Sequence, residues 1–205
     1  MTRPVTRIQA RNSETILQAA LEVFSTHGFR GATLDQISDM AGLSKPNLLY
    51  YFPSKEAMHH ALLTRLLHTW LDPLRAMNPA GEPLAEILGY VRRKIEIAIE
   101  RPAISRLFAM ENMRAEPILK DLLSGARADA LNVCAVLRRW MEAGKMRQQD
   151  PLLLLVHIWA VCEYYSINER QILFLMDADR VDKPLSDKLV AQATQFILAG
   201  CGIPD

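Results

Sequence analysis

Proline and glycine punctuate this chain at short intervals, and the segments between them have apolar residues at helical spacing. Apolar positions three and four apart lie on one face of a helix. No stretch alternates apolar and polar residues as a strand does, and no segment repeats at a fixed period. The 205 residues therefore predict an all-α fold of about nine helices.

Capping residues set the expected helix boundaries. Ser13 is a good N-cap for the first helix, which Gly28 ends, and Thr33 with Gln36 forms a capping box for the second. Asp150 caps a helix that starts at Pro151 and precedes a loop over residues 177–184. The other predicted helices cover residues 45–52, 54–77, 83–100, 102–113, 117–144 and 185–199.

Pro53 divides the chain into two expected domains. Residues 1–53 form a three-helix unit, and residues 54–205 form a larger helical bundle. Within the first domain, Thr33 to Phe52 has the parts of a helix-turn-helix: two short capped helices joined at Gly42, with Leu48 facing inward.

The outward residues of the second short helix suit the edges of DNA bases. Lys45 can donate to guanine or to phosphate, Asn47 can pair with an adenine edge, and Pro46 can contact a thymine methyl group. The hydroxyl groups of Tyr50 and Tyr51 can donate to phosphates. The alternative is a plain three-helix unit with two exposed tyrosines.

Phosphate contacts are expected from the residues around this helix. Thr33 lies at a helix N-terminus, where phosphate binds well, and Lys55 is a candidate clamp. Arg3, Arg7 and Arg11 precede the first acidic residue and form a small basic arm. The whole chain has a net charge of only +1, so DNA binding must depend on this local geometry.

The run FSTHGFRGATLDQISDMAGLSKPNLLYYFPSKEAM resembles the N-terminal domain of TetR-type transcriptional regulators. Later runs, among them SRLFAME and IWAxxxxYY, are similar to the pyrimidine-utilisation regulators of that family. The resemblance implies DNA contacts at eight positions: Thr33, Ser44, Lys45, Pro46, Asn47, Tyr50, Tyr51 and Lys55. Leu49 departs from the pattern, because many members have a phosphate-binding tyrosine there.

The same resemblance implies a transcriptional repressor that binds a palindromic double-stranded operator. It implies a homodimer built from the last two helices of each chain, and a cavity for a small-molecule effector in each C-terminal domain. Effector binding is expected to change the spacing of the two recognition helices and to release the DNA. The effector class stays open between a pyrimidine or related nitrogen compound and an unrelated aromatic or lipophilic ligand.

Glu163 stands in the apolar stretch from Leu152 to Tyr165, where a carboxylate is costly unless it is paired. Trp159 lies one helical turn before it and offers a stacking surface for a flat ligand with N–H groups, such as a nucleobase. The alternative is a structural ion pair with Lys94, Arg106 or a partner chain. Pyrimidine regulators are expected to have glutamine here, so Glu163 favours a ligand with more donors.

Further residues are candidates for the wall of the ligand site. Lys94 can donate to a ligand carbonyl and shares a stripe with Tyr90, although it can also belong to a solvated run with Arg92 and Arg93. Aromatic residues at helical spacing are also found in plain cores. The remaining wall candidates are Trp70, Leu74, Phe108 and Asn112.

The last predicted helix has an apolar stripe that one chain does not easily cover. Together with apolar residues of the helix before it, this stripe predicts a twofold helical interface. Its members are Leu189, Val190, Ala193, Phe196 and Ile197, with Leu152, Leu155 and Tyr164 or Tyr165.

Other classes of protein have little support in the sequence. No catalytic motif, cofactor loop or metal-ligand spacing is present, and the single Glu56-x-x-His59 pair is expected at the surface. The three cysteines are expected to be reduced and buried, in a cytoplasmic protein without a membrane span. An enzyme that uses Glu163 as a base, or a ligand-binding bundle without DNA function, is the remaining alternative.

Overall fold

The computed structural model describes residues 6–114 and 117–203, and it has ten helices and no strand within those ranges. The helices are α1 (Arg7–Gly31), α2 (Leu34–Ala41), α3 (Lys45–Tyr51), α4 (Lys55–Arg75), α5 (Pro83–Glu100), α6 (Pro102–Arg114), α7 (Pro117–Glu142), α8 (Pro151–Ile167), α9 (Glu169–Leu175) and α10 (Lys183–Cys201). The predicted all-α fold is confirmed.

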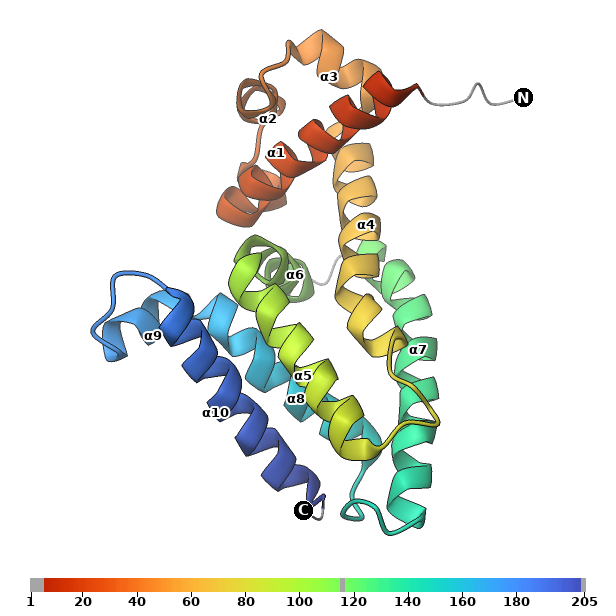
Figure 1. Cartoon of the computed structure of the whole chain (residues 1–205). Coiled ribbons are helices and arrows are strands. Elements are labelled where there is room, and N and C mark those ends of the chain that lie inside the picture. Colours follow the sequence, from red (N-terminus) through yellow and green to blue (C-terminus); the bar gives the residue numbers. More distant parts are fainter. Residues whose placement is uncertain (1–5, 115–116, 204–205) are drawn as a thin grey trace.

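The first three helices form a small head at one end of the molecule, and α4 runs from this head into a larger body (Figure 1). The core of the head consists of fully buried residues from all three helices: Ile16, Ala20, Phe24, Ile37 and Leu48. Residues of α1 at helical spacing meet Ile37 of α2 and Leu48 of α3 in one cluster. This packing fixes the position of α3 on the head.

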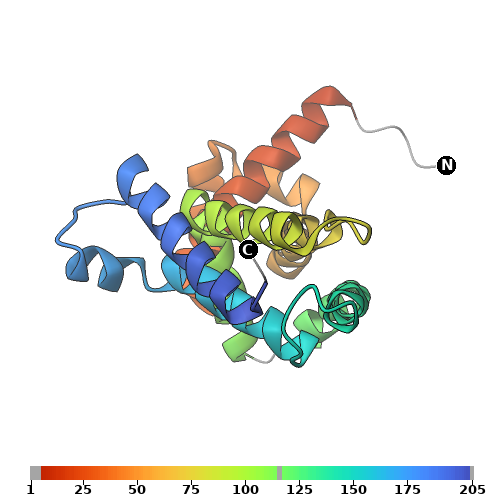
Figure 2. The ribbon, with the colours of Figure 1, turned by 60° about the horizontal axis from the view of Figure 1, so that its bottom comes forward.

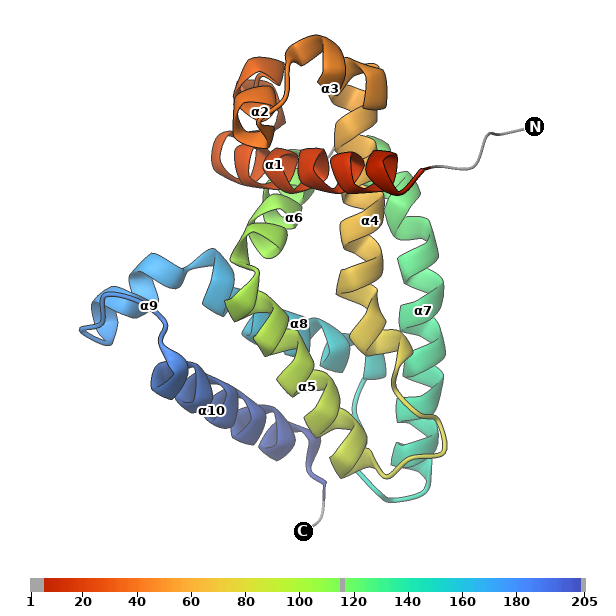
Figure 3. The same ribbon diagram turned by 45° about the horizontal axis from the view of Figure 1, so that its top comes forward.

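The body places α5, α8 and α10 side by side, with α7 along α4 (Figures 1 and 3). Helix α6 packs between the head and the body, where it contacts α1 on one side and α8 on the other. Helix α9 packs against α8, and an ion pair between Arg106 and Glu169 links it to α6. Together with the loop that follows, α9 projects from the side of the body (Figure 2). The cysteines Cys134, Cys162 and Cys201 are free and buried, as expected.

The start of the first helix differs from the prediction. Helix α1 begins at Arg7, because Thr6 forms a capping box with Gln9 seven residues before the predicted cap, Ser13. Arg7 and Arg11 therefore lie on the first turns of α1 and not in an extended arm. Arg3 lies outside the described residues.

The C-terminal helices also differ from the prediction. The helix that starts at Pro151 ends at Ile167, and Asn168 separates it from α9, which raises the count from about nine to ten. The backbone of Asn168, with φ −110° and ψ 28°, is not helical. The last helix begins at Lys183, because Asp182 caps it and Pro184 is tolerated in a first turn.

His59 is buried, so its expected position at the surface was wrong. Its imidazole contacts the rings of Phe24 and Phe29, at centroid distances of 4.9 and 4.8 Å. The sequence gives no sign of this, because the residues that cover His59 come from α1 and α6 and not from its own helix.

Candidate nucleic-acid interface and internal ligand site

Helix α3 lies at the end of the head that faces away from the body (Figure 1). Ser44 caps it by accepting a hydrogen bond from the backbone N–H of Asn47, and Pro46 lies in its first turn. Leu48 is fully buried, which holds one face of the short helix against the head. The opposite face leaves Lys45, Pro46, Asn47 and Tyr50 exposed, as predicted.

Thr33 closes the N-terminus of α2 through the predicted capping box. Its hydroxyl accepts from the backbone N–H of Gln36, and the Gln36 side chain accepts from the Thr33 backbone N–H. Thr33 and Ser44 are both exposed. The N-termini of α2 and α3, which are the positive ends of the helix dipoles, therefore face solvent.

Lys45 forms an ion pair with Asp35, with its Nζ 3.0 Å from the carboxylate oxygen. Both side chains are largely exposed. An exposed pair contributes only about 0–1 kcal/mol, so a guanine edge or a phosphate can replace Asp35 at small cost. The pair keeps the ammonium at the outer surface of α3.

The two tyrosines are held by the start of α1, which sequence reasoning missed. Gln9 donates to the Tyr50 hydroxyl at 3.4 Å, and Asn12 donates to the Tyr51 hydroxyl at 2.8 Å. The rings of Tyr50 and Tyr51 meet edge to face at 5.2 Å. Tyr51 is half-buried, while Tyr50 is exposed. The overlooked Thr6–Gln9 capping box was the signal that could have placed these partners.

Lys55 has a different surrounding from the one predicted. Its Nζ donates to the backbone oxygens of Phe29 and Ala32, at 2.8 Å each, and lies 4.6 Å from the centroid of the Phe29 ring. The ammonium therefore joins the start of α4 to the end of α1. Two of its three donors are used in this structural role, and the phosphate contact of Lys55 stays a prediction.

Six of the eight predicted ligand-site residues meet in the body. Trp70 of α4 lies between Phe108 of α6 and Trp159 of α8, with both centroid distances 5.8 Å. The Trp159 indole N–H donates to the Tyr90 hydroxyl at 2.6 Å. Helices α4, α5, α6 and α8 thus each contribute one ring to a single aromatic cluster.

Lys94 and Glu163 add two charges to this cluster, of which Lys94 is buried and Glu163 is partly buried, with 27 % of its side chain exposed. Lys94 Nζ lies 3.8 Å from Glu163 Oε1 and 3.9 Å from the centroid of the Trp70 ring. The lysine side chain is only 4 % exposed, so it does not belong to a solvated run. Among the partners left open by the sequence, the structure selects Lys94, because Arg106 pairs with Glu169 instead.

Burial dominates the electrostatics of this pair. Loss of solvent lowers the pKa of Lys94 to about 8, against the opposing effect of the Glu163 charge. Burial likewise raises the pKa of Glu163, with smaller opposing contributions from Lys94 and Trp70. At 3.8 Å the two groups attract each other but do not form a hydrogen bond. Glu163 Oε1 has no hydrogen-bond partner within the described residues.

Two predicted wall residues lie elsewhere. Asn112 is exposed, because the opposite side of this last turn of α6 faces the head through Glu111. Leu74 is buried and lines a cleft on the α7 side, together with Met77, Val133 and Val136. Neither residue is retained as a ligand contact.

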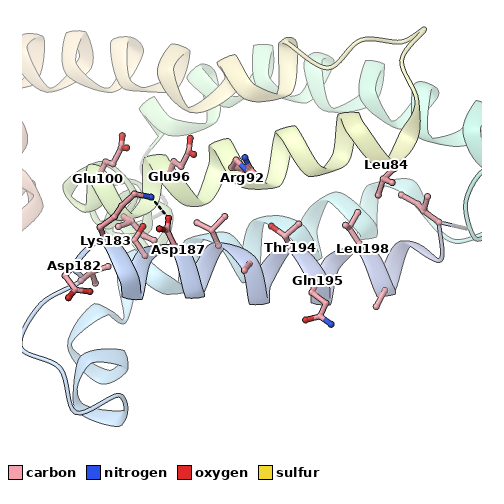
Figure 4. A pocket seen from close by; sticks show the side chains of 17 residues that line it. Leu84, Arg92, Glu96, Glu100, Asp182, Lys183, Asp187, Thr194, Gln195 and Leu198 are labelled. Carbon is pink, nitrogen blue, oxygen red and sulfur yellow. Dashed lines mark hydrogen bonds and ion pairs between the residues drawn. The ribbon is translucent and has the colours of Figure 1, made fainter. Parts of the chain in front are cut away.

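A groove of about 1070 Å³ lies between α5 and α10 (Figure 4). Charged side chains such as Arg92, Glu96 and Glu100 stand along its α5 wall, and Lys183 pairs with Asp187 on the α10 side. None of the predicted ligand-site residues lines this groove. The aromatic cluster instead contains six of the predicted ligand-site residues, and its polar groups Lys94 Nζ and Glu163 Oε1 converge.

An apolar face remains open on α8 and α10. Of the predicted stripe, Leu155, Leu189, Ala193 and Ile197 are buried within the chain, whereas Phe196 is 69 % exposed. The neighbouring exposed side chains on α8 are Leu152, Leu153, Val156, Tyr164 and Ile167. Tyr164 and Phe196 also line one shallow groove across the two helices. No helix within the described residues is long and apolar enough to span a membrane.

Comparisons with known proteins agree with this arrangement. Residues 16–62 match the family described as bacterial regulatory proteins, tetR family, and residues 63–204 match the YcdC-like protein, C-terminal region. The chain is 38 % identical to the HTH-type transcriptional regulator RutR of Escherichia coli K12, over 95 % of this chain and 92 % of that protein. It is 25 % identical to the HTH-type transcriptional repressor NicS of Pseudomonas putida, over 84 % of each chain.

Solved structures show the same fold. The ketosteroid transcriptional regulator KstR2 of Mycobacterium tuberculosis superimposes with a TM-score of 0.73 at 21 % identity, covering 98 % of this chain and all of that one. The regulator FadR of Bacillus subtilis, solved with stearoyl-CoA, gives a TM-score of 0.67 at 14 % identity, covering 91 % of this chain and 98 % of that one. At these identities the likeness concerns the fold alone.

Proposed function

Because this chain belongs to the TetR family of bacterial transcriptional regulators, we propose that it is a dimeric repressor that a small nitrogen heterocycle releases from a palindromic operator. The observation that supports this most is the pairing of an exposed recognition helix with a buried, charged aromatic cluster in one chain. The relatives are regulators and not enzymes, which removes the reading of Glu163 as a catalytic base. Operator binding would place the protein in the cytoplasm.

We retain two domains, residues 1–53 for DNA binding and residues 54–205 for effector binding and dimerisation. The proposed DNA contacts are Thr33, Ser44, Lys45, Pro46, Asn47, Tyr50 and Tyr51, with Arg7 and Arg11 on the adjacent α1. Asn47 reads a base edge, Lys45 binds a guanine edge or a phosphate, and the tyrosine hydroxyls bind phosphate.

The chemistry of the aromatic cluster supports a nitrogen heterocycle as the effector. Trp70 and Trp159 offer flat faces, and Glu163 Oε1 lacks a donor within the described residues. Lys94 Nζ lies 3.8 Å from Glu163 Oε1, beyond hydrogen-bond distance. A planar ring that presents N–H donors to Glu163 and a carbonyl to Lys94 satisfies all of these groups. A purely lipophilic ligand would leave both charges unsatisfied, which argues against that alternative.

A thermal-shift experiment tests the effector class. We expect cytosine, which has an amino group where uracil has a carbonyl, to raise the melting temperature of the wild-type protein more than uracil does. Glu163→Gln supplies both a donor and an acceptor and should reverse this order while operator binding persists. Glu96→Gln, in the α5–α10 groove, is the matched control. The same order of the two bases in all three proteins would contradict the proposed role of Glu163.

The proposed dimer uses the apolar face of α8 and α10. A charge there is incompatible with burial, so Phe196→Glu should give monomers in sedimentation at micromolar concentration, while Ile8→Glu on the exposed face of α1 should not. The wild-type footprint should cover two half-sites separated by about 34 Å or more, and Phe196→Glu should lose it. A wild-type footprint on one unpaired half-site would refute the dimeric reader.

A further inference from the structure

A buried polar cluster lies where the head meets the body. His59 of α4 and Glu111 of α6 are 3 % and 0 % exposed. No predicted DNA-binding or ligand-binding residue belongs to this cluster, which we call the junction: His59, Glu111 and Arg114. Buried polar groups far from a binding site are costly, so their presence at this boundary needs a physical reason.

The contacts of the junction join three helices. His59 Nε2 lies 3.3 Å from Glu111 Oε1, and Arg114 Nη1 donates to the same oxygen at 3.0 Å. The Arg114 guanidinium lies 5.0 Å from the centroid of Phe29, whose ring also packs on His59. The carboxylate of α6 thus holds α4 directly and the end of α1 through Phe29.

The Glu111 carboxylate depends on these partners. Burial raises its pKa, but the interactions with His59 and Arg114 outweigh that effect, and the net pKa is lowered. Its second oxygen has no hydrogen-bond partner within the described residues, and the geometry at His59 Nε2 is too poor for a hydrogen bond. A small shift of α6 therefore either aligns this contact or breaks it, and the two arrangements differ in free energy.

The junction is connected to the aromatic cluster through both of its helices. On α6, Phe108 lies one turn before Glu111, and its ring contacts Trp70. Helix α4, which includes His59, continues to Trp70. A ring that binds beside Trp70 must displace or fix Phe108, and a movement of that turn of α6 also moves Glu111.

We propose that His59, Glu111 and Arg114 are positioning residues that couple the aromatic cluster to the orientation of the head relative to the body. This inference rests on the proposed function, since it assumes an operator and an effector site. Linkage requires the coupling to be reciprocal: if the state of the cluster changes operator affinity, operator binding changes the cluster. The tryptophans of the cluster can report that change without an identified effector.

The experiment uses the full-length protein with Trp140→Phe, so that only Trp70 and Trp159 fluoresce. The probe is a DNA duplex selected from a random pool on the wild-type protein. We expect this duplex to alter the tryptophan emission of the parent protein. Glu111→Gln and His59→Gln should reduce that alteration at least about fivefold, while the operator Kd changes less than about threefold. His60→Gln, the exposed neighbour, and Glu142→Gln are matched controls and should behave like the parent.

A double variant addresses misfolding of the single ones. His59→Phe with Glu111→Leu removes both fully buried groups together, and Arg114, which loses its contact with Glu111, has a side chain that is 22 % exposed and reaches solvent. This variant should fold, bind the duplex and show no change in emission. A full emission change in this variant, or a parent protein that binds DNA with unchanged emission, overturns the role of the junction alone. Failure of the wild-type protein to retain any duplex overturns the regulatory function and the junction together.

Discussion

The double substitution Lys45→Ala with Asn47→Ala weakens operator binding by about 100-fold or more, because each lost base contact is worth about 1–3 kcal/mol. Both side chains lie on the exposed face of α3, so the substitutions remove no core contact. Asn47 donates to the Ser44 cap through its backbone N–H, which alanine also has. A titration of labelled operator at fixed salt measures the loss.

The salt dependence of the single variant Lys45→Ala distinguishes its two possible partners. If Lys45 binds phosphate, the slope of log affinity against log salt falls by about one; if it binds guanine, specificity at one base pair relaxes instead. Lys188→Ala, an exposed lysine on α10, is the matched control and leaves both quantities unchanged. Wild-type affinity in the double variant would show that α3 is not the recognition helix.

The double substitution Lys94→Met with Glu163→Leu produces the second large effect, a more stable protein that no longer responds to its effector. Replacing a buried ion pair by apolar residues of similar size is often stabilising, by about 1–4 kcal/mol, because two desolvation penalties disappear. The Glu163 side chain is 27 % exposed, so we expect a gain at the lower end of that range. For a chain of this length, each kcal/mol corresponds to about 2–4 °C in melting temperature. The thermal shift caused by nucleobases should vanish in the same protein.

The pH dependence of stability gives an independent readout of Lys94. Its pKa is about 8 in the folded chain and 10.5 for an ordinary lysine, so between these values the unfolded chain binds more protons. Stability of the wild-type protein therefore gains a favourable contribution as the pH rises from about 8 towards 10.5. The double variant lacks this contribution.

The matched comparison for the pair is Glu163→Leu alone, measured at equal protomer concentration. This single change leaves Lys94 buried without its carboxylate and should lower stability relative to the wild-type protein. If the double variant were also less stable than the wild-type protein, the pair would be a structural element of the body and not a ligand site.

Much of the local structure could be predicted because the interactions that cause it are short-range. The Thr33 capping box, the Ser44 cap and the Asp150 cap were all confirmed, since each joins a side chain to a backbone N–H within the next few residues. The same rule explains the error at α1. The Thr6 cap obeys it equally well, so two residues, Thr6 and Ser13, fit the rule and only Thr6 caps the helix.

The aromatic cluster was predicted in part, from helical spacing and from the cost of a carboxylate in an apolar stretch. Its members are Trp70, Tyr90, Lys94, Phe108, Trp159 and Glu163. Asn112 shows the limit of that reasoning. A helix has several faces, and the sequence of α6 does not specify which face meets α4 and which meets solvent. For the same reason, the sequence did not decide whether Lys94 or Arg106 is the partner of Glu163.

The sequence by itself determined the helix-turn-helix and its outward residues, because the caps, the glycine turn and the inward Leu48 belong to one short segment. Only the tertiary structure decided that Lys55 binds carbonyl groups, that His59 is buried against Glu111, and that α9 is separate. Burial depends on which distant element packs over a side chain. Charge and hydrophobic pattern describe the side chain alone, so the surroundings of His59 and Lys55 could be read only after α1, α4 and α6 had come together.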